Sequence, residues 1–459
     1  MNIHLIATGG AVMHNMALAM HHKGYKVTGS DDEINEPSRS RLAKYGLLPA
    51  EMGWFPEKIH AGLDAVILGM HARADNPELL RAKELGLNIY SFPEYIYEQS
   101  KDKTRVVIGG SHGKTTITSM IMHVLMHCKL DFDYMVGSQL EGFETMVKLT
   151  HEAPVIILEG DEYLSSPIDR RPKFHLYHPH IALLSGIAWD HVNVFPSYDG
   201  YVEQFNIFVK QIPADGSLIY CAEDQEVKRV CESNEVKCPK YPYFVPKHYI
   251  KNGITYLQIE NSERKTFNVE LSIFGKHNLM NMEGARLVCN RIGITDEQFY
   301  NAIQSFKGAA RRLELVARNE ETAVYKDFAH SPSKLKATTD AVKEQFEGRT
   351  VTACMELHTF SSLSEDFLAE YKGSMDKADE AIVYFNPHTI AHKKLKPITE
   401  EQVKQAFANS KLKVYTDSAK LKEYLLSKSY KNSVLLMMSS GTFDGIDLKE
   451  LANKILSSS

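Results

Sequence analysis

The glycine-rich segment from Gly109 to Thr116 has the composition of a loop that binds phosphate groups. It reads GGSHGKTT, follows the apolar run 106–108 and precedes a segment rich in Met and Ile. Glycines let successive backbone N–H groups point at phosphate oxygens, and a helix after the loop adds its positive end. The Lys114 ammonium would neutralise the β- and γ-phosphates, and the Thr115 hydroxyl could bind Mg²⁺. The full GxxxxGK[ST] pattern would need glycine at Ile108, so the loop is a variant.

Acidic and histidine residues follow two later apolar runs. Glu159-Gly160-Asp161-Glu162 comes after the run 155–158, and Asp190-His191 comes shortly after the run 181–184. Ligands of open α/β sheets gather at the carboxyl ends of strands, and carboxylate oxygens suit Mg²⁺. The sequence therefore indicates a magnesium site beside the loop. A solvated acidic turn and a structural histidine are the alternative interpretations.

Strand-like runs alternate with helical patterns through most of the chain. The runs expected as strands are 3–7, 25–28, 63–68, 87–91, 106–108, 155–158, 181–184, 322–325, 350–354, 380–384 and 434–438. This alternation is typical of parallel sheets with crossover helices. A chain of 459 residues is long enough for three domains at about 150 residues each. The sequence predicts three α/β domains, with the charged stretch 98–105 as a linker, at residues 1–103, 104–308 and 309–459.

Composition excludes several classes of function. A net charge of −5 argues against general nucleic-acid binding, and no apolar stretch reaches the roughly 18 residues of a membrane span. The N-terminus lacks the pattern of a secretory signal. The six cysteines form no CxxC pair and are expected to be reduced thiols: Cys128, Cys221, Cys231, Cys238, Cys289 and Cys354. A cytoplasmic protein without membrane or nucleic-acid partners is the expectation.

Several motifs, in order along the chain, resemble those of the Mur ligases, the ATP-dependent enzymes that build UDP-N-acetylmuramoyl peptides for bacterial cell walls. The matching segments are GGSHGKTT, with Ser111 where threonine is usual, EGDEY (159–163), Trp189-Asp190-His191, GKHNLMN (275–281) and DFAHSP (327–332). The resemblance covers essentially the whole chain. It implies a Rossmann-like N-terminal domain for the UDP-sugar, a central P-loop ATPase domain, and a Rossmann-like C-terminal domain for the amine substrate.

The resemblance also implies roles for single side chains. It implies that the catalytic residues are Lys114, His191, Arg312 and His330. It also implies that the magnesium-associated residues are Thr115, Glu159 and His191. The residues that it implies for ATP binding are Gly110, Ser111, His112, Gly113, Lys114, Thr115, Thr116, Asn278, Asn281, Arg312 and Asp327. Asn278 would pack on the adenine, and Arg312 would approach the transferred phosphate. Ser331 stands where many members have a second histidine, so no role of that histidine carries over.

The N-terminal segment ATGGAVM resembles the G-x-G-G-x-G-M loop with which the alanine-adding branch of the family holds the UDP diphosphate. Ala7 and Val12 replace two of its glycines. Asp31 ends the second expected strand, where an acidic side chain commonly meets a ribose or base. The residues that the resemblance implies for the UDP part of the substrate are Gly9, Gly10, Met13, Ser30 and Asp31.

Two branches of the family match different segments. The stretch DRRPKFHLYHPH (169–180) and the ending MSSGTFDGI (438–446) are similar to the recycling branch. That branch joins L-alanyl-γ-D-glutamyl-meso-diaminopimelate to UDP-N-acetylmuramate. LHTFS (357–361) is closer to the alanine-adding branch, so L-alanine is the alternative amine donor. The recycling reaction is the prediction, with ATP and Mg²⁺ as cofactors and a monomer or homodimer as the assembly.

Two interpretations assign the protein to other functional classes. A nicotinamide-dependent oxidoreductase would use the Rossmann-like start, but it leaves GGSHGKTT unexplained and lacks the first and third fingerprint glycines. A non-catalytic nucleotide-binding regulator would use the loop without chemistry. The ligase reading predicts instead that ATP converts a carboxylate to an acyl-phosphate, which an amine then attacks.

Overall fold

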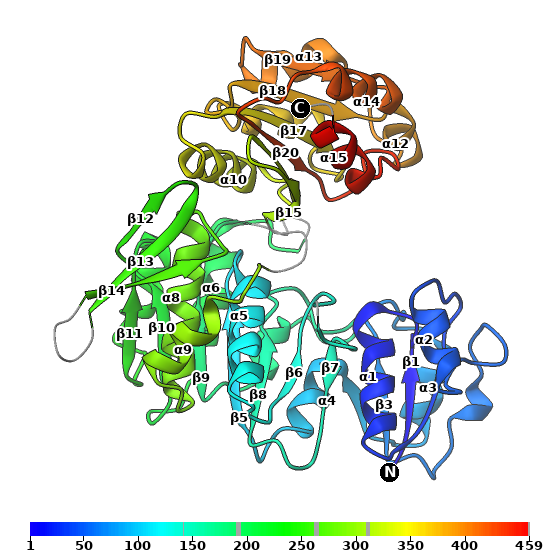
Figure 1. Cartoon of the computed structure of the whole chain (residues 1–459). Coiled ribbons are helices and arrows are strands. Elements are labelled where there is room, and N and C mark those ends of the chain that lie inside the picture. The colour runs from blue at the N-terminus through cyan, green and yellow to red at the C-terminus, as the bar shows by residue number, and fades with distance from the viewer. Residues whose placement is uncertain (141, 190–193, 261–265, 309–312, 458–459) are drawn as a thin grey trace. The chain divides into compact units, whose positions relative to one another are not determined.

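The computed structural model describes residues 1–140, 142–189, 194–260, 266–308 and 313–457. The chain falls into two compact units, the first of Met1–Val245 with Met280–Ile303 and the second of Pro246–Leu279 with Gln304–Ser459. Each unit contains a largely parallel sheet connected by helices (Figure 1). The predicted α/β class is therefore confirmed.

The N-terminal sheet of the first unit has four parallel strands in the order β2-β1-β3-β4. Its strands are β1 (Asn2–Ile6), β2 (Lys26–Ser30), β3 (Ala65–Leu68) and β4 (Ile89–Ser91). The connecting helices are α1 (Ala11–His22), α2 (Ser38–Lys44), η1 (Pro56–Lys58) and α3 (Pro77–Glu84), and α4 (Phe92–Glu98) follows β4. Because all four strands run the same way, their carboxyl ends lie at one edge of the sheet.

A seven-stranded sheet follows in the first unit, in the order β11-β10-β9-β5-β8-β6-β7. Its strands are β5 (Thr104–Gly109), β6 (Asp133–Met135), β7 (Val147–Lys148), β8 (Val155–Glu159), β9 (Ile181–Leu184), β10 (Ser217–Cys221) and β11 (Lys240–Tyr243). Its helices are α5 (Lys114–His127), η2 (Lys173–Leu176), α6 (Tyr198–Lys210), α7 (Gln225–Cys231), α9 (Asp296–Ile303) and the part of α8 (Lys276–Arg291) from Met280 onward.

Strand β5 lies at the centre of this sheet, between β8 and β9, and pairs with both in parallel. The three strands read as continuous apolar runs because helices cover both faces, so their side chains are buried on either side. This order places the segments after β5, β8 and β9 next to one another. Those are the three segments that carry the expected phosphate loop and the expected acidic and histidine residues.

The second unit contains two sheets. The six-stranded sheet, in the order β15-β16-β20-β17-β18-β19, holds β15 (Glu314–Arg318), β16 (Thr322–Asp327), β17 (Thr350–Leu357), β18 (Glu380–Phe385), β19 (Leu412–Tyr415) and β20 (Ser433–Met438). Its helices are α10 (Pro332–Gln345), α11 (Glu365–Leu368), η3 (Ala369–Tyr371), α12 (Pro387–His392), α13 (Glu400–Phe407), α14 (Ser418–Ser427) and α15 (Leu448–Ser457).

The other sheet of the second unit is antiparallel and was absent from the sequence-based expectation. It consists of β12 (His248–Lys251), β13 (Ile254–Glu260) and β14 (Thr266–Leu271). Its outward positions are exposed, so the strands lack the continuous apolar runs that mark the parallel sheets. The side chain of Gln345 at the end of α10 connects to this sheet, because its amide donates to the Gly253 carbonyl oxygen at 2.7 Å.

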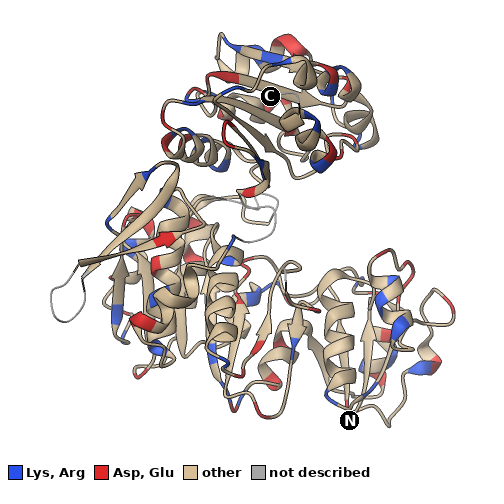
Figure 2. Cartoon of the chain, in the orientation of Figure 1, with Lys and Arg blue, Asp and Glu red and all other residues tan. Residues whose placement is uncertain are grey.

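Charged residues of both signs are interspersed along the ribbons of each unit (Figure 2). This distribution agrees with the small net charge of −5. Among the helices that the structure describes, none combines the length and the apolar character needed to cross a membrane.

The predicted linker 98–105 is short and firmly attached. Helix α4 ends at Glu98 and β5 begins at Thr104. Arg105 is 6% exposed, and its guanidinium donates to backbone carbonyl oxygens on both sides of the connection. The acceptors are Tyr177 and His178 at 3.0 Å, Ser100 at 2.8 Å, Lys101 at 3.2 Å and Lys103 at 3.3 Å. Arg105 therefore fixes the connection to the start of the seven-stranded sheet.

We expect Arg105→Met to destabilise the first unit by about 2–4 kcal/mol, because the variant keeps an apolar stem but leaves buried carbonyl groups without their donors. Urea unfolding monitored by circular dichroism measures the change. Arg73→Met is the matched control, since Arg73 is 83% exposed and pairs only with neighbouring Asp75 in the described chain. The control should shift stability by less than about 0.5 kcal/mol. Equal effects of the two variants would contradict the anchoring role.

Candidate active site

The loop between β5 and α5 needs glycine at two positions. Gly110 and Gly113 have φ angles of +131° and +80°, in the left-handed region that side chains disfavour. A Cβ on Gly110 would collide with the Ser185 side chain, and one on Gly113 would lie 2.5 Å from Asn281 Oδ1. Helix α5 begins at Lys114, so its free N–H groups and positive end face the loop.

Lys114 is held at the mouth of this loop. Its Nζ donates to the Gly110 carbonyl oxygen at 2.6 Å and to Glu162 Oε2 at 2.6 Å, and its side chain is 14% exposed. Burial disfavours the charged ammonium, but the carboxylates of Glu162, Asp161 and Glu159 outweigh it and raise the pKa of Lys114 above its ordinary value. The lysine is therefore a fixed positive charge beside the glycine loop.

Thr115 and Glu159 provide oxygen atoms next to that charge. The Thr115 hydroxyl donates to Glu159 Oε1 at 2.9 Å, and the Gly137 backbone N–H donates to Glu159 Oε2 at 3.0 Å. Glu159 is 8% exposed, and burial raises the pKa of its carboxyl despite the Gly137 hydrogen bond and the charge of Lys114. A hydroxyl and a buried carboxylate side by side fit Mg²⁺, which prefers oxygen ligands. His191, the third expected magnesium residue, lies outside the described residues.

A buried hydrogen-bonded chain supports the loop from behind. Ser111 Oγ and the Tyr201 hydroxyl are 2.8 Å apart, and the Tyr201 hydroxyl donates to Glu162 Oε1 at 3.1 Å. The Ala188 backbone N–H also donates to Ser111 Oγ, at 2.8 Å. Ser111 thus supplies the hydroxyl that threonine would supply. The sequence named Glu162 within the acidic group 159–162 but did not indicate its pairing with Lys114, because EGDEY does not reveal which acid faces the lysine. Tyr201 was missed, because it lies on α6 without any local motif.

The N-terminal loop brings Gly9 and Asp31 together. The Gly9 backbone N–H donates to Asp31 Oδ2 at 2.6 Å, and a Cβ on Gly9 would lie 2.9 Å from the same oxygen. Burial raises the pKa of the Asp31 carboxyl. Ala7 has a φ angle of +65°, in the left-handed region that favours glycine. The backbone turn is therefore kept, although the residue carries a side chain.

The other residues expected around the UDP moiety lie on or next to β2 and α1. Ser30 is fully buried and its Oγ lies 3.4 Å from Lys58 Nζ, while Met13 is buried in α1. Gly10 precedes α1, and the nearest atom to a Cβ built there is 3.7 Å away, on His71. Gly9 and Gly10 therefore lie just after the carboxyl end of β1, and Ser30 and Asp31 lie at the carboxyl end of β2.

The residues expected from the C-terminal half belong mostly to the second unit. Asp327 is buried, and its carboxylate accepts the backbone N–H groups of Leu313 and Ala329, each at 2.7 Å. His330 Nδ1 is 2.8 Å from the Phe328 carbonyl oxygen. Asn278 Nδ2 donates to the Phe274 carbonyl oxygen at 2.9 Å. Arg312 lies outside the described residues.

Thr116 and Asn281 complete the loop's surroundings in the first unit. Thr116 is buried in the first turn of α5. Asn281 is 9% exposed and its side chain fills the space beside Gly113. His112 is exposed and lies against Gly186, where a Cβ would run into the imidazole. Asn281 and His112 therefore occupy the space next to Gly113 and Gly186.

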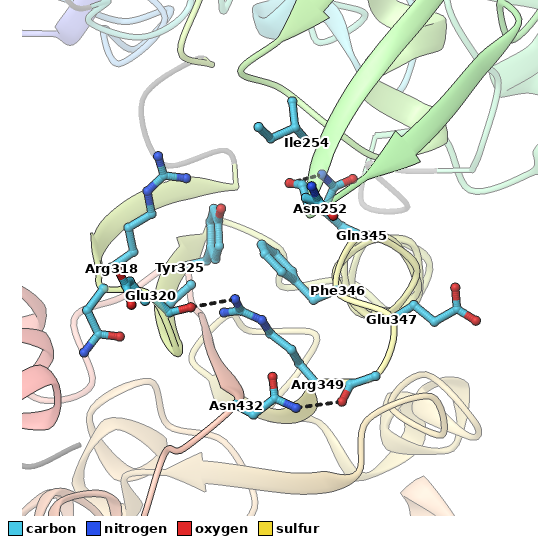
Figure 3. A pocket seen from close by; sticks show the side chains of 14 residues that line it. Asn252, Ile254, Arg318, Glu320, Tyr325, Gln345, Phe346, Glu347, Arg349 and Asn432 are labelled. Carbon is cyan, nitrogen blue, oxygen red and sulfur yellow. Dashed lines mark hydrogen bonds between the residues drawn. The ribbon is translucent and has the colours of Figure 1, made fainter.

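A cavity of about 730 Å³ lies elsewhere, inside the second unit (Figure 3). Its lining includes no residue expected for the site. Arg349 donates to the Glu320 carbonyl oxygen at 2.9 Å and Asn432 to the Gly348 carbonyl oxygen at 3.0 Å, so polar groups of the wall bind one another. The polar groups around the glycine loop lie in the first unit, at the carboxyl ends of β5 and β8, and none of them lines this cavity.

A lysine-bearing glycine loop at the end of the central strand of a parallel sheet, with a threonine and an acidic residue beside it, defines a P-loop nucleotide-binding protein. Comparison with protein families narrows the class. Residues 2–104 match the model "Mur ligase family, catalytic domain", residues 108–289 the "Mur ligase middle domain" and residues 311–441 the "Mur ligase, glutamate ligase domain". The chain belongs to the Mur ligase family, and it is an ATP-dependent ligase that joins a carboxylate to an amine.

Relatives from two branches are similar to the chain. A UDP-N-acetylmuramate–L-alanine ligase of Caldicellulosiruptor bescii is 31% identical over 82% of each chain. The UDP-N-acetylmuramate–L-alanyl-γ-D-glutamyl-meso-2,6-diaminoheptandioate ligase of Haemophilus influenzae is 26% identical over 98% of each chain. The crystal structure of a murein peptide ligase from Psychrobacter arcticus has the same fold, with a TM-score of 0.64, 24% identity and coverage of 99% of both chains.

We expect Gly186→Ala to weaken the binding of ADP with Mg²⁺ by about tenfold, because the new methyl group displaces His112 from the loop. Isothermal titration calorimetry measures the affinity. The double variant Gly186→Ala/His112→Ala lacks the imidazole that the methyl group would displace. Its affinity for ADP with Mg²⁺ should therefore be close to that of His112→Ala alone. If Gly186→Ala is equally harmful with and without His112, the collision is not the cause.

Proposed function

We propose that the protein joins L-alanyl-γ-D-glutamyl-meso-diaminopimelate to UDP-N-acetylmuramate in the recycling of peptidoglycan. The observation that carries the proposal is the similarity to the Haemophilus influenzae tripeptide ligase, which spans 98% of both chains. The DRRPKFHLYHPH segment supports the same branch through its similarity to that branch's motif, and it lies between β8 and β9. Free cysteines in the described chain are consistent with work in the cytoplasm.

The candidate site supplies the groups that ATP requires. The glycine loop and the N-terminus of α5 would hold the phosphates, with Lys114 neutralising the β- and γ-phosphates. Thr115 and Glu159 would hold Mg²⁺, whose positive charge assists phosphoryl transfer when it is bound. His191 and Arg312 are proposed to join them from segments outside the described residues. Asn278, Asn281 and Asp327 are proposed to contact the nucleotide.

The proposed reaction has two steps. A lactyl carboxylate oxygen of UDP-N-acetylmuramate attacks the γ-phosphorus of ATP, ADP leaves, and an acyl-phosphate forms. The deprotonated α-amine of the tripeptide then attacks the acyl carbon, the C–O bond to phosphate breaks, and an amide and inorganic phosphate result. Lys114 stabilises the negative charge on the transferred phosphoryl oxygens. Gly9, Gly10, Met13, Ser30 and Asp31 would hold the UDP part at the edge of the N-terminal sheet.

Addition of L-alanine is the second candidate function. The 31% identical relative from Caldicellulosiruptor bescii is a UDP-N-acetylmuramate–L-alanine ligase, and this favours the alternative. The chemistry at the phosphate loop is the same for both donors. The two functions differ only in the amine that attacks the acyl-phosphate.

A ligation assay with UDP-N-acetylmuramate, ATP and Mg²⁺ tests the proposal. The tripeptide and L-alanine are supplied in separate reactions, and the products are identified by mass spectrometry. We expect kcat/KM to be at least about a hundredfold higher for the tripeptide, a difference of about 2.7 kcal/mol in transition-state binding. A preference for L-alanine would establish the alternative function instead.

We expect Lys114→Ala to lower kcat for ligation by about 10²–10³, because the charge on the transferred phosphoryl group loses its fixed ammonium. Release of phosphate, measured at saturating ATP and Mg²⁺, reports the change. Lys83→Ala is the control, since Lys83 is an exposed residue of α3. Near-normal turnover by Lys114→Ala would refute the role of the loop.

A further inference from the structure

The segment between β8 and β9 contains a lysine to which the proposed function gives no task. Lys173 begins η2, and its Nζ forms an ion pair with Asp161 Oδ2 at 2.5 Å. The Lys173 side chain is 16% exposed and that of Asp161 is 34% exposed. An ammonium group has three N–H donors, and within the described chain Asp161 accepts one of them.

The backbone around Lys173 is fixed. Its N–H donates to the Tyr163 carbonyl oxygen at 3.0 Å, and the Phe174 N–H donates to the Asp161 carbonyl oxygen at 3.1 Å. The Phe174 side chain is fully buried and stacks on Phe208, with ring centroids 4.5 Å apart. The segment from Asp161 to Lys173 is therefore a loop whose two ends are held together by these backbone hydrogen bonds. Lys173, the last residue of this loop, is held in place because the neighbouring Phe174 is anchored in the core of the seven-stranded sheet.

Lys173 lies where the carboxyl-end edges of the two parallel sheets of the first unit meet. Its Nζ is 5.7 Å from the ring centroid of Phe92, which directly follows β4. Its ion-pair partner Asp161 follows β8, the neighbour of the strand that leads into the phosphate loop. The Gly9 loop follows β1, which belongs to the same parallel sheet as β4. Substrates of open α/β sheets bind at these edges.

Two consecutive carboxylates hold two lysines at this junction. Glu162 pairs with Lys114, and Asp161 pairs with Lys173. Lys114 is assigned to the phosphates of ATP. The second ammonium is thus available next to the phosphate loop, on the side of the N-terminal sheet. A carboxylate that is to be phosphorylated must reach both the sugar-nucleotide loop and the γ-phosphate, and it carries the charge that an ammonium binds.

We propose that Lys173 binds the carboxylate of the acceptor substrate and holds it for attack on ATP. The inference rests on the proposed function, because it takes UDP-N-acetylmuramate as that acceptor. Lys173 donates a hydrogen bond to one carboxylate oxygen and leaves the other free to attack. Asp161 holds the ammonium in place before the substrate arrives and limits its motion afterwards.

Binding measurements with two sugar nucleotides test the role of Lys173. UDP-N-acetylmuramate carries the lactyl carboxylate, and UDP-N-acetylglucosamine has a hydroxyl group in place of the whole lactyl ether but is otherwise alike. We expect Lys173→Met to weaken UDP-N-acetylmuramate about ten- to a hundredfold, the range of a hydrogen bond to a charged group, and to change UDP-N-acetylglucosamine affinity by less than about twofold. ADP with Mg²⁺ should bind to the variant as to the unchanged protein.

Two further variants complete the experiment. Lys173→Arg keeps the positive charge and should recover most of the discrimination between the two sugar nucleotides. Lys101→Met is the matched control, because Lys101 also pairs with a carboxylate, Glu98 at 2.6 Å, and lies 5.4 Å from the Tyr97 ring centroid, but it is 52% exposed. The control should leave all three affinities unchanged.

The outcomes separate the inference from the proposed function. If the unchanged protein does not prefer UDP-N-acetylmuramate to UDP-N-acetylglucosamine, the proposed acceptor is wrong and the inference falls with it. If it does prefer UDP-N-acetylmuramate but Lys173→Met weakens both sugar nucleotides equally, or neither, Lys173 does not bind the carboxylate and only the inference is overturned. Thermal unfolding of each variant establishes that the protein is folded.

Discussion

A lysine ammonium that is almost enclosed by protein needs a carboxylate beside it, and the arrangement around the phosphate loop follows from this constraint. Lys114 is 14% exposed and binds Glu162, whose other oxygen accepts from Tyr201. Tyr201 in turn contacts Ser111 within the loop. The positive charge of Lys114 is therefore held in a fixed place by groups in the segments after β5 and β8 and on α6. Removal of any one of them leaves a buried polar group without its partner.

The same constraint explains why the site forms at one edge of a parallel sheet. Strand β5 lies between β8 and β9, so the loop after β5 and the acidic segment after β8 must meet. Among the described residues, Lys114, Glu159 and the Thr115 hydroxyl meet at this edge. The sheet order is therefore a chemical requirement as well as a folding pattern, because a strand inserted between β5 and β8 would separate the lysine from its carboxylates.

The parts of the fold that were predictable from sequence are those with local signals. The glycine loop was identifiable because strand, glycines and lysine are consecutive, and the strands buried on both faces were identifiable as continuous apolar runs. The sheet β12–β14 was not, because its exposed positions remove that run. Glu162 was visible in the sequence, but its pairing with Lys114 depends on which way one carboxylate turns. Tyr201 could not be found, since its contact with the loop joins residues on separate elements.

Two positions depart from the motifs that the sequence resembles, and each still makes a defined contact or turn. Ser111 lacks the methyl group of threonine but keeps the hydroxyl, and that hydroxyl is the atom that Tyr201 and Ala188 contact. Ala7 replaces glycine but still adopts a φ angle of +65°, a conformation that costs a residue with a side chain roughly 1 kcal/mol or more. The chain therefore keeps the hydroxyl contact and the turn while changing the residue that provides each. At these two positions the hydrogen-bonding atom and the backbone turn are present although the residue type departs from the motif.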